Sequence, residues 1–169
     1  GRHPLRALIN ALRTTVGYEE APLESLLRND PTSLARELAH RLGNGLGLVL
    51  FIDQLEELVT VAAPAEASLV SEALGSLLNR TASIRVLLTA RSDFLGRIAM
   101  LEGLGSAVTS CLYILRPLGP ERIRDVIVGP AHAKGVVFEN PEVVNSLIDS
   151  TAQTDGGLPL LQFALSELW

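Results

Sequence analysis

Three carboxylates follow an uninterrupted apolar segment near the middle of the chain, and their spacing points to metal-assisted chemistry. The apolar run is Leu-Val-Leu-Phe-Ile at 48–52; Asp53 ends it, and Glu56 and Glu57 follow three and four positions later. An apolar run without alternation is typical of a parallel strand with helices on both faces. An acid at the end of such a strand lies at the carboxyl edge of the sheet, where open α/β folds bind ligands. We therefore expect Asp53 to hold Mg²⁺ through water, as a Walker B acid does, and a nearby carboxylate to orient or deprotonate a water molecule.

The same spacing has a purely structural interpretation. Asp53 and Glu56 are separated as in a capping box, in which the first acid accepts from first-turn amides and the second reaches back. This alternative explains neither the apolar strand before the acids nor the additional carboxylate of Glu57. The two interpretations are also compatible, because an acid can cap a helix and still lie near a cation.

A basic residue follows the next predicted strand. That strand covers 84–90, and Arg91 comes directly after it. The helix expected at 65–79 connects the two strands, and a strand-helix-strand unit of this size is almost always parallel. One interpretation is an ion pair of Arg91 with Asp53 or Glu57. The other is a sensor that contacts the terminal phosphate of a nucleotide, because a guanidinium matches phosphate oxygens bidentately.

The remaining elements are predicted from apolar periodicity and from prolines at helix starts. Helices are expected from Pro4 to before Gly17, at 23–28, from Pro31 to the turn at 43–45, and from Ser92 or Asp93 to about 101, followed by a third strand at 112–115. Three more helices are expected to begin at Pro120, Pro141 and Pro159. The pattern predicts an α/β layer followed by a small helical lid.

Composition limits the classes that the chain can belong to. Its 169 residues suit one domain, and 47% hydrophobic with only 4% aromatic residues favours helices packed on a sheet. No run is long enough for a membrane span, and the amino end lacks a signal sequence. Cys111 is the single cysteine, which excludes an internal disulfide; we expect it to be buried, and we expect a cytoplasmic location. A net charge of −5 with dispersed basic residues argues against nucleic acid as a partner.

The order of segments resembles the NTPase domain of the STAND class, in particular the novel STAND group of bacterial proteins often fused to WD-type or other repeats. The segments that carry the resemblance are VLFIDQLEEL at 49–58, IRVLLTARSDFLGRI at 84–98, ILRPLGPERIRDVIVGPAHAKGVVFE at 114–139 and DGGLPLLQFALSELW at 155–169. The resemblance implies an AAA+-like P-loop NTPase that acts as a nucleotide-controlled signalling switch. ATP or ADP, Mg²⁺, the other domains of the same chain and a nucleotide-dependent homo-oligomer are the implied ligands and partners.

The resemblance also implies roles for individual residues. Asp53 corresponds to the Mg²⁺-associated acid, and Gln54 departs from the AAA+ proteins that have the catalytic Glu there. Glu56 is therefore expected to activate water, with Glu57 second, and Arg91 to be the sensor. Two further residues belong to a GxP-like motif whose proline packs near the adenine. They are Gly157 and Pro159; their alternative interpretation is a tight turn followed by a helix start.

A phosphate-binding loop of the form G-x-x-x-x-G-K-[ST] does not occur in the sequence. We therefore interpret the chain as a piece of a longer protein, with residues 1–118 forming part of an incomplete three-layer NTPase core and 119–169 the start of the helical lid. Such a piece is expected to be inactive by itself and to bind nucleotide poorly.

Three alternatives remain open at this point. The chain could be a non-catalytic scaffold that holds effector and repeat domains, or part of a degenerate NTPase. It could also belong to a DNA-associated AAA+ ATPase, which its acidic balance disfavours. The three histidines are scattered without the spacing of metal ligands, and they are expected to be ordinary surface or helix residues.

Overall fold

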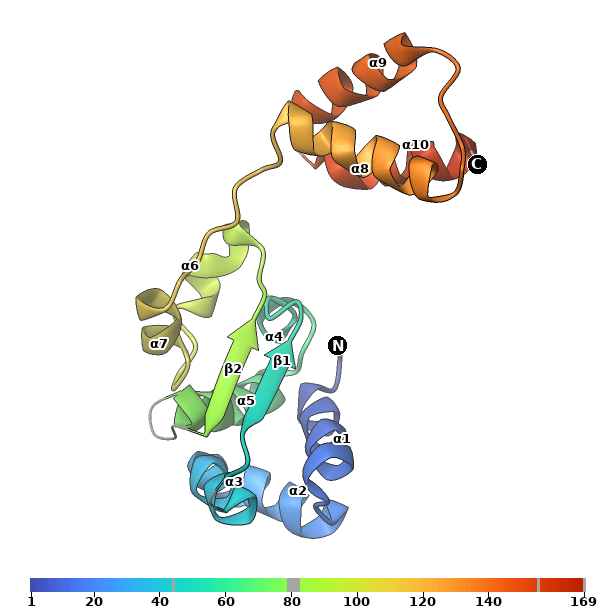
Figure 1. The fold of residues 1–169 in the computed structure, drawn as a ribbon. Helices are drawn as coiled ribbons and strands as arrows, with labels where there is room; N and C mark the ends of the chain where they lie inside the picture. The colour runs from blue at the N-terminus through green and yellow to red at the C-terminus, as the bar shows by residue number, and fades with distance from the viewer. Residues whose placement is uncertain (44, 79–82, 155, 169) are drawn as a thin grey trace. The chain divides into compact units, whose positions relative to one another are not determined.

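The computed structural model describes residues 1–43, 45–78, 83–154 and 156–168. These residues form two compact units, Gly1–Ile114 and Leu115–Trp169, which are described separately below. The chain is mostly helical with a small two-stranded parallel sheet in its first unit (Figure 1). This architecture is compatible with an incomplete α/β domain. No helix in the described ranges has the length and apolar character that a membrane span requires.

Helices open the first unit and provide much of its core. They are α1 (Pro4–Val16), α2 (Glu20–Asn29), the 3₁₀ turn η1 (Pro31–Ser33) and α3 (Leu34–Leu42). Proline occupies the first position of α1, and Gly17 ends the helix in the left-handed region with φ 73°, as predicted. Apolar side chains at helical spacing form the buried stripe of α1; they are Leu5, Leu8, Ile9 and Leu12.

The sheet consists of two parallel strands joined through a long helix. The strands β1 (Leu48–Ile52) and β2 (Ile84–Leu88) pair in register from Leu48↔Ile84 to Ile52↔Leu88. The helix α5 (Pro64–Leu78) connects them and packs against the sheet. The predicted strands and connecting helix are therefore confirmed, although β2 ends two residues before the expected position and the predicted helix end at Asn79 lies outside the described residues.

Within the first unit, the described residues leave one face of the sheet uncovered, which corrects the expectation that its own helices cover both faces. Leu48, Leu50 and Ile84 are buried against the helices. On the other face Val49 is 70% exposed, and Phe51 and Leu87 are similarly open. The apolar run arises because both faces of β1 carry large apolar side chains, but the described helices of the first unit cover only one of them.

Short helical turns follow β2. They are η2 (Ser92–Phe94), α6 (Leu95–Ile98) and α7 (Gly105–Ser110), and the residues from 112 to 119 adopt no regular structure. The predicted strand at 112–115 is therefore wrong. Its four residues are apolar, but they are exposed. A segment with high strand propensity forms a strand only where a neighbouring strand edge accepts its hydrogen bonds. Cys111 is exposed rather than buried, which corrects a second expectation.

The second unit is a three-helix arrangement. It comprises α8 (Pro120–Ala133), α9 (Pro141–Ala152) and α10 (Gly157–Leu168). A small apolar core joins them, made by Ile123, Ile127, Val144, Ile148 and Leu161. The side chain of Asn140 caps α9 by accepting from the amide of Glu142 at 2.8 Å. The predicted starts of α8 and α9 are confirmed, whereas α10 begins at Gly157 rather than at Pro159.

A close backbone approach fixes α5 in the first unit. The hydroxyl of Ser71 donates to the carbonyl of Glu102 at 2.6 Å. One turn later, a Cβ added to Gly75 would lie 2.3 Å from the carbonyl oxygen of Gly103. No Cβ occupies such a position without a shift of backbone, so the packing of α5 on this loop requires glycine at 75.

We therefore expect Gly75→Ala to destabilise the chain by about 1–3 kcal/mol through overpacking, although alanine is the better helix former. Denaturant unfolding followed by circular dichroism measures the change. Gly96→Ala is the matched control, because Gly96 lies in α6 with open space around its Cβ position. The control should be neutral or stabilising by up to about 1 kcal/mol; equal effects of both changes would contradict the close-approach argument.

Candidate functional site

The carboxyl ends of β1 and β2 meet at one edge of the sheet. The backbone pairing continues beyond the strands. The amide of Thr89 donates to the carbonyl of Ile52 at 2.9 Å, and the amide of Leu55 donates to the carbonyl of Thr89 at 2.8 Å. The loops that carry the predicted acids and the predicted arginine therefore begin side by side. This is the geometry that parallel strands impose on the residues that follow them.

Asp53 is held across this edge by a residue of the other strand end. The hydroxyl of Thr89 donates to Oδ1 of Asp53 at 2.5 Å, and the amide of Gln54 donates to the same hydroxyl at 3.0 Å. Gln54 has φ 58°, and among the described residues it is the one non-glycine with positive φ. A strained residue directly after the strand-end acid is a feature that often accompanies functional sites.

Glu56 is the buried acid of the group. Its residue is 9% exposed, and Oε2 accepts from the backbone amide of Arg91 at 3.3 Å. The helix that follows, α4 (Glu57–Thr60), has no side-chain cap. The capping-box interpretation is therefore wrong for the described residues, because Asp53 bonds to Thr89 and Glu56 bonds across the sheet edge.

Glu57 points elsewhere. Its carboxylate lies beside the backbone of Gly1, and its side chain is 36% exposed. Within the described residues it forms no hydrogen bond or ion pair with Arg91. The structure thus joins Asp53 and Glu56 across the shared strand edge by hydrogen bonds, and among the described residues it gives Glu57 no such bond there.

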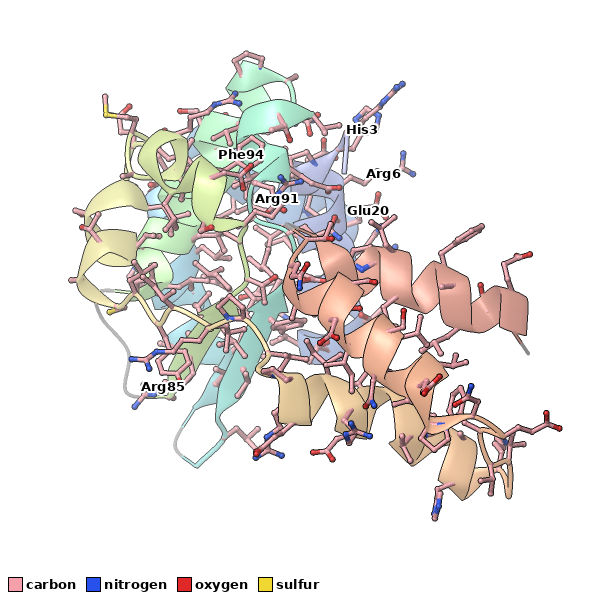
Figure 2. The ribbon with its side chains drawn as sticks, turned by 90° about the horizontal axis from the view of Figure 1, so that it is seen from above. His3, Arg6, Glu20, Arg85, Arg91 and Phe94 are labelled. Atoms are coloured by element: carbon pink, nitrogen blue, oxygen red, sulfur yellow. The ribbon has the colours of Figure 1, made fainter. Side chains whose placement is uncertain are left out.

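The guanidinium of Arg91 is paired, but with Asp93, which the sequence interpretation considered only as a helix start. Nε and one terminal nitrogen donate to the two oxygens of Asp93 at 3.1 and 2.8 Å. The guanidinium also lies 5.4 Å from the ring centroid of Phe94, and Figure 2 shows the two side chains beside each other. The predicted ion pair with Asp53 or Glu57 is therefore wrong. Arg91 pairs instead with the residue two positions later. Arg91 directly precedes the turn η2, and Asp93 lies within it.

This pairing shifts both titrations. The hydrogen bond from Arg91 lowers the pKa of Asp93 below its ordinary value of 3.8, and the Asp93 carboxylate raises the pKa of Arg91. Both side chains are more than half exposed, so solvent screens the interaction.

The two residues of the GxP-like motif lie in the second unit, where α10 begins. Gly157 is buried, and a Cβ there would lie 2.4 Å from the carbonyl oxygen of Thr151 at the end of α9. Pro159 is exposed in the first turn of α10. Glycine at 157 thus has a packing role within this unit, and the turn-and-helix-start interpretation accounts for both residues.

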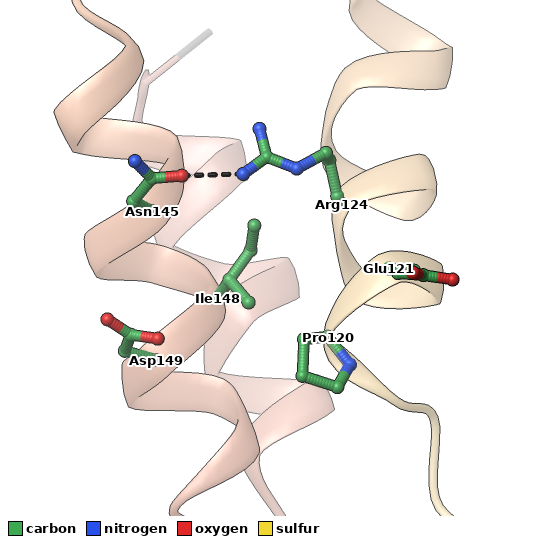
Figure 3. A pocket seen from close by; sticks show the side chains of 6 residues that line it. All are labelled: Pro120, Glu121, Arg124, Asn145, Ile148 and Asp149. Atoms are coloured by element: carbon green, nitrogen blue, oxygen red, sulfur yellow. Dashed lines mark hydrogen bonds between the residues drawn. The ribbon is translucent and has the colours of Figure 1, made fainter.

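The described residues contain no cluster of three or more potential metal-ligating His, Cys, Asp or Glu side chains. Two cavities are lined by other residues. One, of about 820 Å³, is bordered by η1, α5 and the loop at 102–103. The other, of about 410 Å³, lies between α8 and α9, where Arg124 donates to Asn145 at 2.6 Å (Figure 3).

Sequence reasoning placed Thr89, Asp93 and Phe94 at this edge, but it assigned no role to Thr89 or Phe94 and no pairing of Asp93 with Arg91. The proximity of Thr89 to Asp53 could have been predicted. Each residue follows one of two parallel strands, and the ends of parallel strands lie at the same edge of the sheet. The partnership of Asp93 with Arg91 depends on the turn between them, which spacing alone does not determine.

Comparison with known families decides the affiliation of the chain. A family model described as Novel STAND NTPase 1 matches residues 1–169. The chain belongs to this novel STAND NTPase 1 family. No curated protein and no solved structure matches it significantly. The resemblance to the STAND class of NTPases, which rests on four segments between residues 49 and 169, is therefore confirmed.

The pH behaviour of Asp93 in this STAND NTPase domain tests the Arg91 pair. A lowered pKa means that the ionised carboxylate is favoured on folding, so its stabilisation is present above pH 3.8 and is lost as the pH falls through the lowered pKa. We expect Arg91→Gln to raise the pKa of Asp93 toward its ordinary value. Carboxyl ¹³C NMR between about pH 2 and 6 measures it.

Asp30 supplies the control for this titration. Hydrogen bonds from Ser33 and Thr32 lower the pKa of Asp30, so Arg91→Gln should leave it unchanged. An Asp93 titration that is insensitive to Arg91 would show that the pair does not form in solution.

Proposed function

We propose that this STAND NTPase domain supplies part of the nucleotide-binding and hydrolysing core of an ATP-dependent signalling switch. The observation that supports the proposal is the juxtaposition of Asp53 and the buried Glu56 at the shared carboxyl edge of β1 and β2, beside the backbone of Arg91. In a family of NTPases, acids at that edge are placed where a metal-bound triphosphate is activated.

The strand-end acid fits Mg²⁺ by its chemistry. Asp53 is an exposed carboxylate, and Mg²⁺ is commonly held through one or two carboxylates while it keeps several waters. A single acid without a surrounding cage of protein ligands suits that mode. When bound, Mg²⁺ neutralises charge on the phosphate oxygens of the nucleotide.

Glu56 is the residue to which we assign water activation, with Glu57 second. Burial and the Arg91 amide hold the Glu56 carboxylate in place, and a fixed carboxylate can accept a proton from an attacking water. Glu57 is more exposed than Glu56, which makes it the weaker candidate. Gly157 and Pro159 are assigned to the adenine side of the nucleotide from the family resemblance alone.

Arg91 is assigned as the sensor of the terminal phosphate. Its guanidinium already recognises the two oxygens of Asp93 bidentately, and a phosphate presents the same geometry. Binding of a terminal phosphate by Arg91 therefore requires that Asp93 releases the guanidinium.

A non-catalytic scaffold is the second candidate function. The existing Arg91–Asp93 pair favours it, because this arginine is satisfied without a ligand. In a scaffold the acids at 53 and 56 serve only the local fold, and ATP has no effect on the protein.

Substitution of the two acids in the full-length protein distinguishes these functions. Glu56→Gln should lower the turnover of ATP by about 10²- to 10⁴-fold with little change in nucleotide affinity, since it removes only the proton acceptor. Asp53→Asn should raise the Mg²⁺ concentration that is needed for half-maximal turnover. Phosphate release at varied ATP and Mg²⁺ concentrations measures both effects.

Glu24→Gln is the matched control, because Glu24 is a carboxylate on α2 whose one ion-pair partner among the described residues is Arg28 on the same helix. Its turnover should equal that of the parent protein. Unchanged turnover in Glu56→Gln would refute the assignment of the base, and the absence of any ATP effect in the parent would favour the scaffold.

The sensor assignment makes a separate prediction. Asp93→Asn removes the competitor for the guanidinium, so we expect the Kd for Mg²⁺-ATP to fall by about two- to fivefold, the scale expected for an exposed ion pair. Calorimetric titration of the full-length protein measures it. Arg91→Gln combined with Asp93→Asn should remove the gain; an equal gain without Arg91 would exclude the competition.

A further inference from the structure

Thr89 connects the two strand ends through four hydrogen bonds. Its backbone amide and carbonyl bond to Ile52 and Leu55. Its hydroxyl bonds to the carboxylate of Asp53 and to the amide of Gln54. The roles proposed above for the carboxylates and for Arg91 do not involve Thr89. Its hydrogen bonds nevertheless reach every residue from 52 to 55.

The direction of the hydroxyl proton follows from its two partners. The amide of Gln54 can only donate, so the oxygen of Thr89 accepts there. The hydroxyl has one proton, and it is therefore directed at Oδ1 of Asp53. Among the described residues Oδ2 of Asp53 accepts no hydrogen bond. One oxygen of the strand-end acid is thus fixed by the protein, and the other remains available to solvent.

The same hydroxyl stabilises an unfavourable backbone. Gln54 has φ 58°, a region that non-glycine residues seldom adopt. The hydrogen bond from its amide to Thr89 and the bond from the next amide, of Leu55, hold the turn in this conformation. Because Gln54 directly follows Asp53, its backbone conformation sets the direction in which the chain leaves the acid.

We propose that Thr89 is a positioning residue for metal-dependent hydrolysis, acting through Asp53 rather than on the nucleotide. This inference rests on the proposed function. The hydroxyl holds one oxygen of the carboxylate and leaves the other free, where it could hold a hydrated Mg²⁺, and it maintains the turn that begins at Gln54. A methyl group in its place offers neither the donor nor the acceptor.

Thr89→Val and Thr89→Ser separate the hydroxyl from the shape of the side chain. Valine keeps the branched shape and removes the hydroxyl, whereas serine keeps the hydroxyl. In the full-length protein, Thr89→Val should raise the Mg²⁺ concentration for half-maximal ATP turnover by about 5- to 20-fold, while Thr89→Ser should stay within about twofold of the parent. A general loss of folded protein would lower turnover without moving the Mg²⁺ dependence.

Amide exchange gives a readout that does not depend on activity. In Thr89→Val the Gln54 amide loses its acceptor, so NMR of the 169-residue chain should show it exchanging about tenfold faster or more. The Leu55 amide bonds to the carbonyl of Thr89, which the substitution keeps, so it serves as the internal control. Thr89→Ser should leave both amides as in the parent.

The outcomes separate the two proposals. Asp53→Asn is the reference: if it leaves Mg²⁺-dependent turnover unchanged, the proposed function fails whatever Thr89 does. If Asp53→Asn impairs turnover but Thr89→Val exposes Gln54 and keeps the parent's Mg²⁺ dependence, the role of Thr89 is overturned. It is equally overturned if Thr89→Ser loses as much as Thr89→Val, because the hydroxyl would then not be the cause.

Discussion

The in-register parallel pairing of β1 with β2 is the constraint on which the rest of the candidate site depends. It places Ile52 opposite Leu88, so the residues that follow each strand meet across one edge. A slip of one residue would turn the buried side chains outward and separate Asp53 from Thr89. The register is specified by apolar burial on the covered face, so the polar geometry at the edge is a consequence of core packing. The acids themselves contribute little to it.

The difference between apolar packing and polar geometry also explains how much of the structure the sequence could predict. Helix starts at prolines, the end of α1 at Gly17 and both strands depend on local chemistry or on strong apolar patterns, and the structure has them close to the expected positions. The partners of the polar groups depend on register and turn geometry. Glu56 accepts from a backbone amide, which no side-chain pattern reports, and Arg91 pairs with Asp93 within its own turn. Sequence reasoning could place these groups at one edge, but it could not assign their hydrogen bonds.

The two largest differences between the sequence-based expectations and the structure have one physical origin. The predicted strand at 112–115 and the bare sheet face with Val49, Phe51 and Leu87 both consist of apolar residues that are exposed. An apolar pattern indicates that a segment is suited to burial. To form a strand, the segment also needs a neighbouring strand that accepts its hydrogen bonds. A strand with two apolar faces is suited to a larger layered core than the first unit provides. That pattern agrees with the proposed function, in which this STAND domain is one part of a nucleotide-binding core.

The charged groups at the edge differ in how firmly they are held, and the difference suits their proposed roles. Glu56 is buried and bonded to a backbone amide, so its carboxylate is placed by the fold before any ligand arrives. Arg91 is 69% exposed and held by a surface pair, which solvent weakens. Phosphoryl transfer depends on preorganised positioning of the group that acts on water, and a base therefore gains from rigidity. A sensor must instead change partners when the terminal phosphate is present. An arginine that is already shaped to a two-oxygen acceptor, and held only at the surface, can make that exchange at small cost.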